Sequence, residues 1–314
     1  MADEMGMGKT IQMIALLLSE QSADQPTLIV CPTIALGQWK AEIARHTEPG
    51  SLNVELYYGP NRDRRLSNFQ TSTIFLTTYS TIETDHRRQE YGFKRQGETV
   101  REKSPLFQVT FFRIVLDEAH SIKDRASNTA RAVFQLKCER KWSLSGTPLQ
   151  NRVGELYSLI RFLQVSPFSY YFCEKCDCKM LQWSFKKDHK HCDGCGHVSH
   201  QHYCWWNREV LRPIQQHGAT GEGRAGFAKL SRLMPRIMLR RTKLECADDL
   251  GLPPRVVITR RDFFNEEEED FYEAYLVFII VVLNIRFQAL FRVQDQVCLV
   301  RAAGHVAQQL CARV

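Results

Sequence analysis

Long apolar runs are scarce in this 314-residue sequence. The longest, residues 276–283, is much shorter than the roughly 20 residues that a membrane-spanning helix needs, so we predict no membrane partner. The first ten residues are acidic and then glycine-rich, and they lack the basic start and apolar centre of a secretory signal. Both absences argue against a membrane protein or a secreted protein.

The sequence also lacks the spread of cysteines that a secreted disulfide scaffold needs. Six of its 11 cysteines fall between Cys173 and Cys204, interleaved with histidines. Such clustering, without a secretory signal, is typical of metal binding in a reducing compartment. Composition is otherwise ordinary for a globular protein, and the net charge of +7 favours a polyanionic partner only weakly.

The first half of the chain alternates apolar, strand-like runs with helical patterns. The expected strands are residues 27–31, 54–58, 73–77, 112–116 and 141–144. The expected helices are residues 9–20, 34–46, 128–136 and 154–163. Nearly continuous strand hydrophobicity with intervening helices predicts an α/β fold, in which helices cover both faces of a central parallel sheet and ligands bind at the carboxyl ends of its strands.

The remaining segments are more polar. We expect residues 84–103 to form an exposed insertion and the glycine-rich residues 217–226 to form a mobile loop. The amphipathic pattern of residues 227–242 predicts a helix with a basic end, and we expect residues 255–263 to form a strand. Asn265 predicts the N-cap of a further helix, because acidic residues follow it in what would be the first turn.

A glycine-rich segment precedes the first expected helix. Gly6 and Gly8 allow the backbone to close around an anion at the helix N-terminus. Lys9 can then reach the terminal phosphates of a nucleotide, and Thr10 can offer its hydroxyl to Mg²⁺. The general phosphate-loop pattern has a glycine where this sequence has Asp3. Taken alone, the segment is therefore as consistent with a simple turn before a helix.

Two carboxylates follow the strand expected at residues 112–116. Asp117 can hold Mg²⁺ through water, and Glu118 can polarise the water that attacks the γ-phosphate in line. A single carboxylate here often only caps the next helix, but a pair downstream of a lysine loop favours ATP hydrolysis. The candidate catalytic residues are Glu118, Asp117 and Lys9. The candidate residues for binding ATP and Mg²⁺ are Gly6, Gly8, Lys9, Thr10 and Asp117.

Four motifs in order resemble those of the Swi/Snf-type superfamily-two DNA-dependent ATPases. Residues 3–12 resemble motif I, which tolerates the aspartate in this family. Residues 31–33 and 38–39 resemble motif Ia, and residues 77–79 resemble motif Ib. Residues 144–151 resemble motif III, where RNA helicases with the same Asp-Glu-Ala-His string usually carry Ser-Ala-Thr. This last segment discriminates the family, and the resemblance implies a RecA-like phosphate-loop lobe.

Within the family, the sequence is most similar to the Rad-sixteen-type branch, nucleotide excision repair translocases that survey non-transcribed DNA. The resemblance is carried by residues 117–125, 143–163, 172–178, 238–243, 247–255 and 261–268. It implies movement along double-stranded DNA in the nucleus, with sequence-independent backbone contacts and other DNA-repair proteins as partners. The DNA contacts that it implies are Pro32, Thr33 and Thr78.

The resemblance covers most of residues 1–275 and departs from the family at both ends. The strand that should precede the phosphate loop is missing, and so are the second ATPase lobe with its arginine finger and the RING domain. We therefore expect a truncated chain with little ATP turnover, since hydrolysis in this family occurs between two lobes. The expected organisation is a helicase lobe at 1–163, a zinc-binding insertion with its loop at 164–226, a helical return and the start of a linker at 227–275, and a non-family tail at 276–314.

Two cysteine pairs with the spacing of zinc knuckles are separated by fifteen residues. Cys173 and Cys176 form the first pair, and Cys192 and Cys195 form the second. Their thiolates can approach one tetrahedral Zn²⁺ from two sides, and four thiolates leave no open position, so we expect a structural ion. Further nearby residues leave ligand swapping or a second ion open: Cys178, His191, His197, His200, His202 and Cys204.

Other features keep two interpretations. Arg240, Arg241 and Lys243 could contact phosphate or the ATP cleft, or they could lie at a solvated helix end. Trp39 and Trp142 are expected to be core residues rather than stacking platforms. For the whole chain, the rival of an ATPase is a zinc-dependent DNA- or protein-binding module without ATP turnover, and DNA-stimulated ATP hydrolysis separates the two. A metabolic phosphate-loop enzyme is disfavoured because it does not explain the motif III segment.

Overall fold

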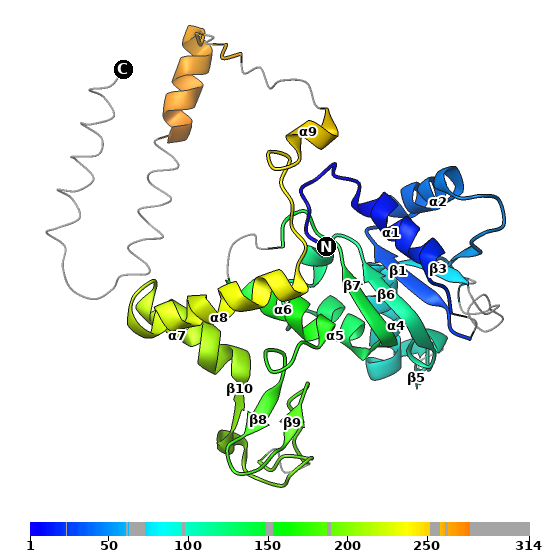
Figure 1. Cartoon of the computed structure of the whole chain (residues 1–314), viewed down its shortest axis with the longest axis vertical. Coiled ribbons are helices and arrows are strands. Elements are labelled where there is room, and N and C mark those ends of the chain that lie inside the picture. The colour runs from blue at the N-terminus through cyan, green and yellow to red at the C-terminus, as the bar shows by residue number, and fades with distance from the viewer. Residues whose placement is uncertain are drawn as a thin grey trace, which may run out of the picture. The chain divides into compact units, whose positions relative to one another are not determined.

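The computed structural model describes residues 1–22, 24–60, 62, 73–95, 98–148, 153–186, 190–251, 258–260 and 263–276. Its contacts divide the chain into two units, residues 1–252 and residues 253–314. The first unit contains a large parallel sheet and the Cys/His segment (Figure 1). Within the residues just given, no helix is both long and apolar enough to cross a membrane.

A five-stranded parallel sheet forms the centre of the first unit (Figure 1). Its strand order is β2 (Val54–Leu56), β3 (Ile74–Thr78), β1 (Thr27–Cys31), β6 (Thr110–Leu116) and β7 (Lys137–Ser143). The register places Val30 of β1 between Thr77 of β3 and Leu116 of β6. The predicted α/β fold with a central parallel sheet is confirmed, and each strand predicted in the lobe is present with its ends shifted by a few residues.

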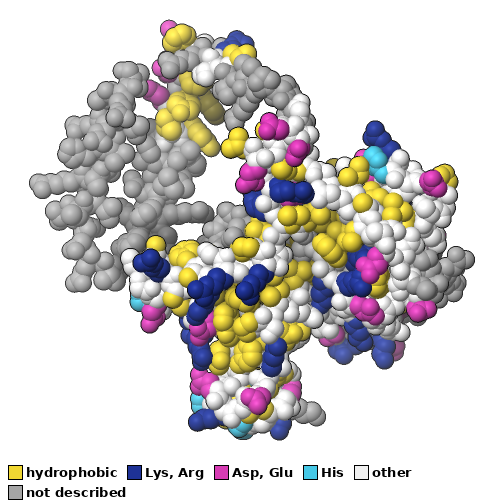
Figure 2. Space-filling model, in the orientation of Figure 1, with side chains coloured by type: hydrophobic (Ala, Val, Ile, Leu, Met, Phe, Trp, Pro, Cys, Tyr) yellow, Lys and Arg dark blue, Asp and Glu magenta, His cyan; other side chains and the backbone are white. Residues whose placement is uncertain are grey.

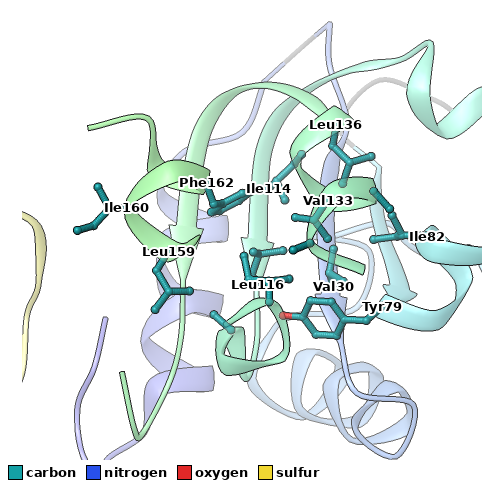
Figure 3. Packing of buried hydrophobic residues seen from close by; sticks show 14 of the residues in the cluster. Val30, Tyr79, Ile82, Ile114, Leu116, Val133, Leu136, Leu159, Ile160 and Phe162 are labelled. Carbon is teal, nitrogen blue, oxygen red and sulfur yellow. The ribbon is translucent and has the colours of Figure 1, made fainter. Parts of the chain in front are cut away.

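Successive residues of the strands point to opposite faces of the sheet, so the lobe has two cores. The helices that cover the sheet are α1 (Lys9–Ser19), α2 (Ala35–His46), α4 (Tyr79–Tyr91), α5 (Asn128–Gln135) and α6 (Val153–Leu163). Ile29 and Val115 belong to the core under α1 and α2. Val30 and Leu116 belong to the core under α4, α5 and α6 (Figure 3). Burial on both faces explains why the central strands β3, β1 and β6 read as nearly continuous apolar runs.

Most described residues of 84–103 are exposed, as expected, but the segment has regular structure. The first part of the segment continues α4, and the rest contributes a hairpin of β4 (Phe93–Arg95) and β5 (Glu98–Val100). The buried face of α4 includes Asp85, whose carboxylate accepts a hydrogen bond from the Tyr57 hydroxyl at 2.7 Å. Because part of the buried face is polar, the helical period is weak in the hydrophobicity pattern.

The glycine-rich residues 217–226 also differ from the expected loop. Helix α7 (Arg212–His217) ends there, and α8 (Gly221–Ile237) begins after one short turn. A Cβ on the buried Gly223 would lie only 2.1 Å from the carbonyl oxygen of Gly218. The glycine therefore allows α8 to approach the end of α7, and the expectation of a mobile loop is wrong for most of this segment.

A small antiparallel sheet carries the Cys/His segment and projects away from the lobe (Figure 1). Its strands, in spatial order, are β10 (His202–Cys204), β8 (Tyr171–Cys173) and β9 (Lys179–Met180). From β10 the chain passes through a π-helical turn into α7. Cys204 and Trp206 are buried within the second core of the lobe, so packing at its base joins the small sheet to the lobe.

The first unit ends with the short helix α9 (Ala247–Leu250). In the second unit, residues 266–276 are helical and Asn265 is the N-cap, as predicted. The Asn265 side chain accepts a hydrogen bond from the Glu268 backbone N–H at 2.8 Å, and the Glu268 side chain accepts one from the Asn265 backbone N–H at 3.0 Å. The strand predicted at 255–263 and the tail expected at 276–314 lie largely outside the described residues.

Candidate nucleotide and metal sites

The phosphate loop lies beside the carboxyl end of β7, where Met1 donates to the Ser143 carbonyl at 2.8 Å. Gly6 and Gly8 have φ angles of 81° and 73°, a region that other residues rarely adopt. Gly8 is the N-cap of α1, which begins at Lys9. A loop of this kind directs backbone N–H groups and the positive end of a helix towards an anion.

Lys9 lies between the loop and the motif III segment. Its Nζ donates hydrogen bonds to the carbonyl oxygens of Asp3 at 2.9 Å and Glu4 at 3.1 Å. A Cβ on Gly146 would lie 3.7 Å from this Nζ and 2.9 Å from the Met5 side chain. The glycine of motif III therefore leaves the space in which the loop and its lysine fit.

The carboxylate of Asp117 is held from two sides at the end of β6. Its Oδ2 accepts a hydrogen bond from Trp39 Nε1 at 2.8 Å, and its Oδ1 accepts one from the Glu118 backbone N–H at 2.9 Å. The Tyr79 hydroxyl donates to the Asp117 carbonyl at 2.6 Å. Trp39 is buried, as predicted, but its bond to Asp117 is a positioning contact that the sequence did not reveal.

Glu118 occupies a left-handed backbone conformation with φ 46° and ψ 53°, which is uncommon for a residue other than glycine. The chain turns here from β6 into a single 3₁₀ turn, Ala119–Ile122. The Ala119 N–H donates to the Leu144 carbonyl at 2.9 Å, and this bond ties the carboxylate pair to motif III. Glu118 Oε2 lies 3.1 Å from His120 Nδ1. Strain of this kind is characteristic of functional sites.

Two side chains beside Asp117 are kept neutral. Burial raises the pKa of the Cys31 thiol to about 12, with a further contribution from the charge of Asp117. Burial, and after it the charge of Asp117, holds the pKa of the Tyr79 hydroxyl well above its ordinary value. Tyr79 therefore remains a hydrogen-bond donor to the Asp117 carbonyl across the physiological pH range.

The segment after α8 lies against the phosphate loop. Helix α8 ends at Ile237, so the prediction of a helix through residue 242 is wrong. The Leu239 carbonyl accepts a hydrogen bond from the Ala2 N–H at 2.7 Å, and the Arg241 carbonyl accepts one from the Glu4 N–H at 3.2 Å. These backbone groups pair with the start of the chain instead of extending the helix.

Arg240 and Arg241 therefore border the nucleotide loop, the first of the two alternatives that the sequence left open. The Arg241 guanidinium forms an ion pair with the buried Asp3 carboxylate. Burial disfavours the charge on Asp3, but the hydrogen bonds from Arg241 outweigh it and hold the pKa of Asp3 below its ordinary value. Arg240 donates to the Gly146 carbonyl at 3.2 Å. The aspartate that replaces the usual glycine thus anchors the loop to the segment after α8.

The predicted DNA contacts lie in different environments. Pro32 and Thr33 follow β1 at the carboxyl edge of the sheet, and Thr33 is exposed. Thr78 is only 1% exposed, and its Oγ1 accepts a hydrogen bond from the Thr81 N–H at 3.1 Å as the N-cap of α4. Ser80, in the first turn of the same helix, carries an exposed hydroxyl.

The Cys/His segment brings its ligand atoms together in two groups rather than one. The first group is Cys173, Cys176, Cys195 and His197, and the second is Cys178, Cys192, Cys195 and His202. Within each group, all ligand atoms lie within 4.8 Å of one another. Three of the four predicted cysteines share the first group, while Cys192 lies in the second. The spacing of the pairs could not reveal which histidines would join them.

The remaining candidates from this segment have other surroundings. Cys204 is buried in the core of the lobe. In the part of the chain that the structure describes, His191 and His200 belong to neither ligand group. Figure 2 shows the histidines of this segment near the tip of the projecting sheet and basic side chains along α7 and α8.

A parallel sheet with a lysine loop beside an acidic strand end is the architecture of a phosphate-loop nucleotide-binding lobe of the helicase type. More narrowly, the chain belongs to the SNF2-related domain family, whose sequence model matches residues 1–190. It is therefore a member of a helicase-like ATPase family, as the motifs predicted.

Known relatives agree with this assignment. ATP-dependent helicase rhp16 of Schizosaccharomyces pombe is 55% identical over 274 residues, which cover 87% of this chain and 32% of the relative. DNA repair protein RAD5A of Arabidopsis thaliana is 34% identical over 267 residues, 82% of this chain and 21% of the relative. The chain thus spans a third or less of the length of these relatives, and its likeness to the Rad-sixteen-type branch is confirmed.

Solved structures with the same fold include the Sulfolobus solfataricus SWI2/SNF2 ATPase core in complex with double-stranded DNA. The TM-score is 0.52 at 25% sequence identity, and the match covers 78% of this chain and 40% of the other. The ATPase core domain of the same protein gives a TM-score of 0.51.

Proposed function

We propose that this chain supplies the ATP-binding lobe of a translocase that moves along double-stranded DNA in DNA repair or chromatin, in the nucleus. The proposal rests mainly on two contacts of the motif III segment. Its Gly146 packs against the loop that carries Lys9, and the Leu144 carbonyl accepts a hydrogen bond from Ala119, directly after Asp117 and Glu118. The names of the relatives support a repair role. The Sulfolobus ATPase core, described with double-stranded DNA, supports duplex DNA as the partner.

Nucleotide binding rests on the loop. The backbone at Gly6 and Gly8 is bent for close approach to phosphate oxygens, and Lys9 neutralises the charge of the terminal phosphates. When ATP binds, Lys9 exchanges its hydrogen bonds with the carbonyls of Asp3 and Glu4 for bonds to phosphate. Thr10 would supply its hydroxyl as a ligand of Mg²⁺.

The carboxylates divide the remaining work. Bound Mg²⁺ would polarise the phosphate oxygens and offset the charge that develops on them. Asp117 fits the part of a Mg²⁺ ligand through water, because Trp39 and the Glu118 N–H hold its carboxylate in one orientation. Glu118 accepts the proton of the attacking water or orients it for in-line attack, and its Oε2 lies 3.1 Å from His120 Nδ1.

DNA binding rests on the carboxyl edge of the sheet. Thr33 and Ser80 are exposed hydroxyls beside β1 and at the start of α4, and Pro32 precedes Thr33. Contacts of hydroxyls and backbone amides with phosphates position a protein on DNA without reading its sequence. The proposal therefore predicts sequence-independent, salt-sensitive binding, with other DNA-repair proteins as further partners.

We also propose that residues 171–204 bind zinc and that the metal is structural. The two ligand groups contain only thiols and imidazoles, the ligands that Zn²⁺ prefers in closed tetrahedral sites. Such sites stabilise segments that have too small a core to fold alone.

Nucleotide binding tests the main proposal directly. In the 314-residue chain, Lys9→Ala should weaken the binding of a fluorescent ATP analogue with Mg²⁺ by about 10- to 100-fold, because a charged hydrogen-bond donor is lost. Lys40→Ala, on the exposed side of α2, is the matched control. Equal affinity of the Lys9→Ala chain and the control would refute the assignment. A wild-type chain that binds DNA but no nucleotide would favour the rival zinc-dependent binding module.

A further inference from the structure

The first ligand group has the dimensions of a tetrahedral metal site. His197 Nδ1 lies 3.5 Å from Cys173 Sγ and 3.5 Å from Cys176 Sγ. Zinc–sulfur and zinc–nitrogen bonds of about 2.3 and 2.0–2.1 Å give sulfur–nitrogen edges of about 3.5–3.6 Å in a tetrahedron. The imidazole is thus placed at bonding geometry to one ion shared with both thiols of the first cysteine pair.

The second ligand group is equally compact. Cys178 Sγ and Cys192 Sγ are 4.0 Å apart, close to the sulfur–sulfur edge of about 3.8 Å in a zinc tetrahedron. His202 Nε2 lies 3.2 Å from Cys195 Sγ. A Cβ on Gly194 would be 3.4 Å from Cys178 Sγ, so glycine at that position lets the second cysteine pair close on Cys178.

The buried His202 is oriented as a metal ligand. Its Nδ1 lies 3.1 Å from the Val198 carbonyl oxygen. A carbonyl oxygen can only accept a hydrogen bond, so Nδ1 carries the proton and donates it. The lone pair of Nε2 is left facing Cys195. An imidazole whose other nitrogen donates to a backbone carbonyl is the usual arrangement around protein-bound zinc.

Cys195 belongs to both groups. Two separate four-ligand sites would need eight ligands, and among the described residues of this segment seven belong to the two groups. A thiolate has enough lone pairs to bind two ions at once, and sharing it gives each ion three ligands of its own and a fourth in common. We propose that residues 171–204 hold a binuclear zinc cluster in which the Cys195 thiolate bridges the two ions. This inference rests on the zinc site proposed above.

The cluster accounts for how the small sheet is assembled. The first ion ties the end of β8, which carries Cys173, to the turn that carries His197. The second ion ties Cys178 and Cys192 to His202 at the start of β10. Cys195, the bridging residue, lies in a tight turn in which the Cys192 carbonyl accepts a hydrogen bond from the Gly196 N–H at 2.9 Å. Both coordination spheres are closed, so the cluster has a structural role.

Metal content is the first test. The 314-residue chain, purified without chelators, should contain two zinc ions per chain by elemental analysis. One ion per chain would overturn the bridged cluster and leave the zinc site of the proposed function intact. No zinc would refute both, and iron in place of zinc would overturn the assignment of the metal.

The bridge itself is tested by replacing zinc with ¹¹³Cd and recording its NMR spectrum. Two cadmium resonances that show scalar coupling to each other are expected, because the coupling passes through the shared sulfur. Two uncoupled resonances would mean independent ions and would overturn the bridge. This measurement uses the wild-type chain and does not depend on the folding of any variant.

Single substitutions then assign the ions. His197→Ala should remove the first ion and Cys178→Ser the second, so each variant should lose about half of the metal. His200→Ala, an exposed histidine outside both groups, should retain both ions as the control. Loss of all metal from the His200→Ala chain, or of none from the other two, would contradict the ligand assignment.

Discussion

The sheet lobe and the Cys/His segment are ordered by different forces. The lobe buries apolar residues on both faces of its sheet, and removal of that surface from water stabilises it. Within the described part of residues 171–204, the buried side chains are Cys173, Cys192, His202 and Cys204. Three of these four belong to the ligand groups, so the segment has almost no apolar core of its own. A stable lobe and a metal-dependent appendage are therefore expected to respond to different perturbations.

The largest expected effect is confined to the lobe. Glu118→Gln should lower the rate of DNA-stimulated ATP hydrolysis by about 10²- to 10⁴-fold, because the amide cannot accept a proton from the attacking water. ATP affinity should stay within a few-fold of wild type. The rate is measured as phosphate release from a chain that also carries a second ATPase lobe, with Glu139→Gln on the exposed part of β7 as control. Near-normal turnover would remove Glu118 from the mechanism.

Removal of zinc should affect the Cys/His segment and leave the lobe intact. Treatment with a zinc chelator should speed proteolytic cleavage within residues 171–204 by about tenfold or more, since ligand contacts replace a core there. Affinity for the ATP analogue should change by less than about twofold, because the phosphate loop and its hydrogen-bond partners lie outside residues 171–204. Cleavage sites are mapped by mass spectrometry. Equal cleavage with and without chelator would mean that the segment has another source of stability.

A smaller effect is expected from the contact that orients Asp117. Trp39→Phe keeps an aromatic ring in the core but removes the hydrogen bond to Asp117 Oδ2. Loss of one such bond should weaken Mg²⁺-dependent ATP binding by about 2- to 10-fold. The comparison is made by titrating ATP at low and high Mg²⁺ concentrations. Trp142→Phe, which leaves Asp117 untouched, should bind as wild type, and a deficit of equal size there would indicate a general packing defect.

The smallest effect concerns pH. Arg241 holds the pKa of Asp3 below its ordinary value of 3.8, so the ion pair stabilises the folded chain above that pH and the contribution is lost as the pH falls through the folded pKa. The melting temperature of wild type should therefore exceed that of Asp3→Asn by a small margin at pH 6. The margin should shrink as the pH is lowered from about 5 to about 3. A melting-temperature difference that stays constant over this range would show that Asp3 does not stabilise the fold through its charge.

Local patterns determined much of the lobe. The apolar strands, the glycines before α1 and the carboxylates after β6 are each specified within a few neighbouring residues, because strand burial and helix starts leave a short-range signature. These features could be predicted from the sequence. The helical segments that were not predicted, α4 and the start of α8, lie where polar or glycine-rich residues form helices, and there the apolar period is too weak to be recognised.

Only the tertiary structure decided which distant groups meet. Trp39 reaches Asp117 across 78 positions of the chain, and Asp3 reaches Arg241 across 238. The sequence determined that residues of metal-binding type and spacing lie in the Cys/His segment, but not that Cys195 would stand between two groups. The reason is physical: ligand type and spacing are local properties, whereas the partition of ligands between sites depends on how β8, β9 and β10 pair, and that pairing is made by contacts that no short stretch of sequence encodes.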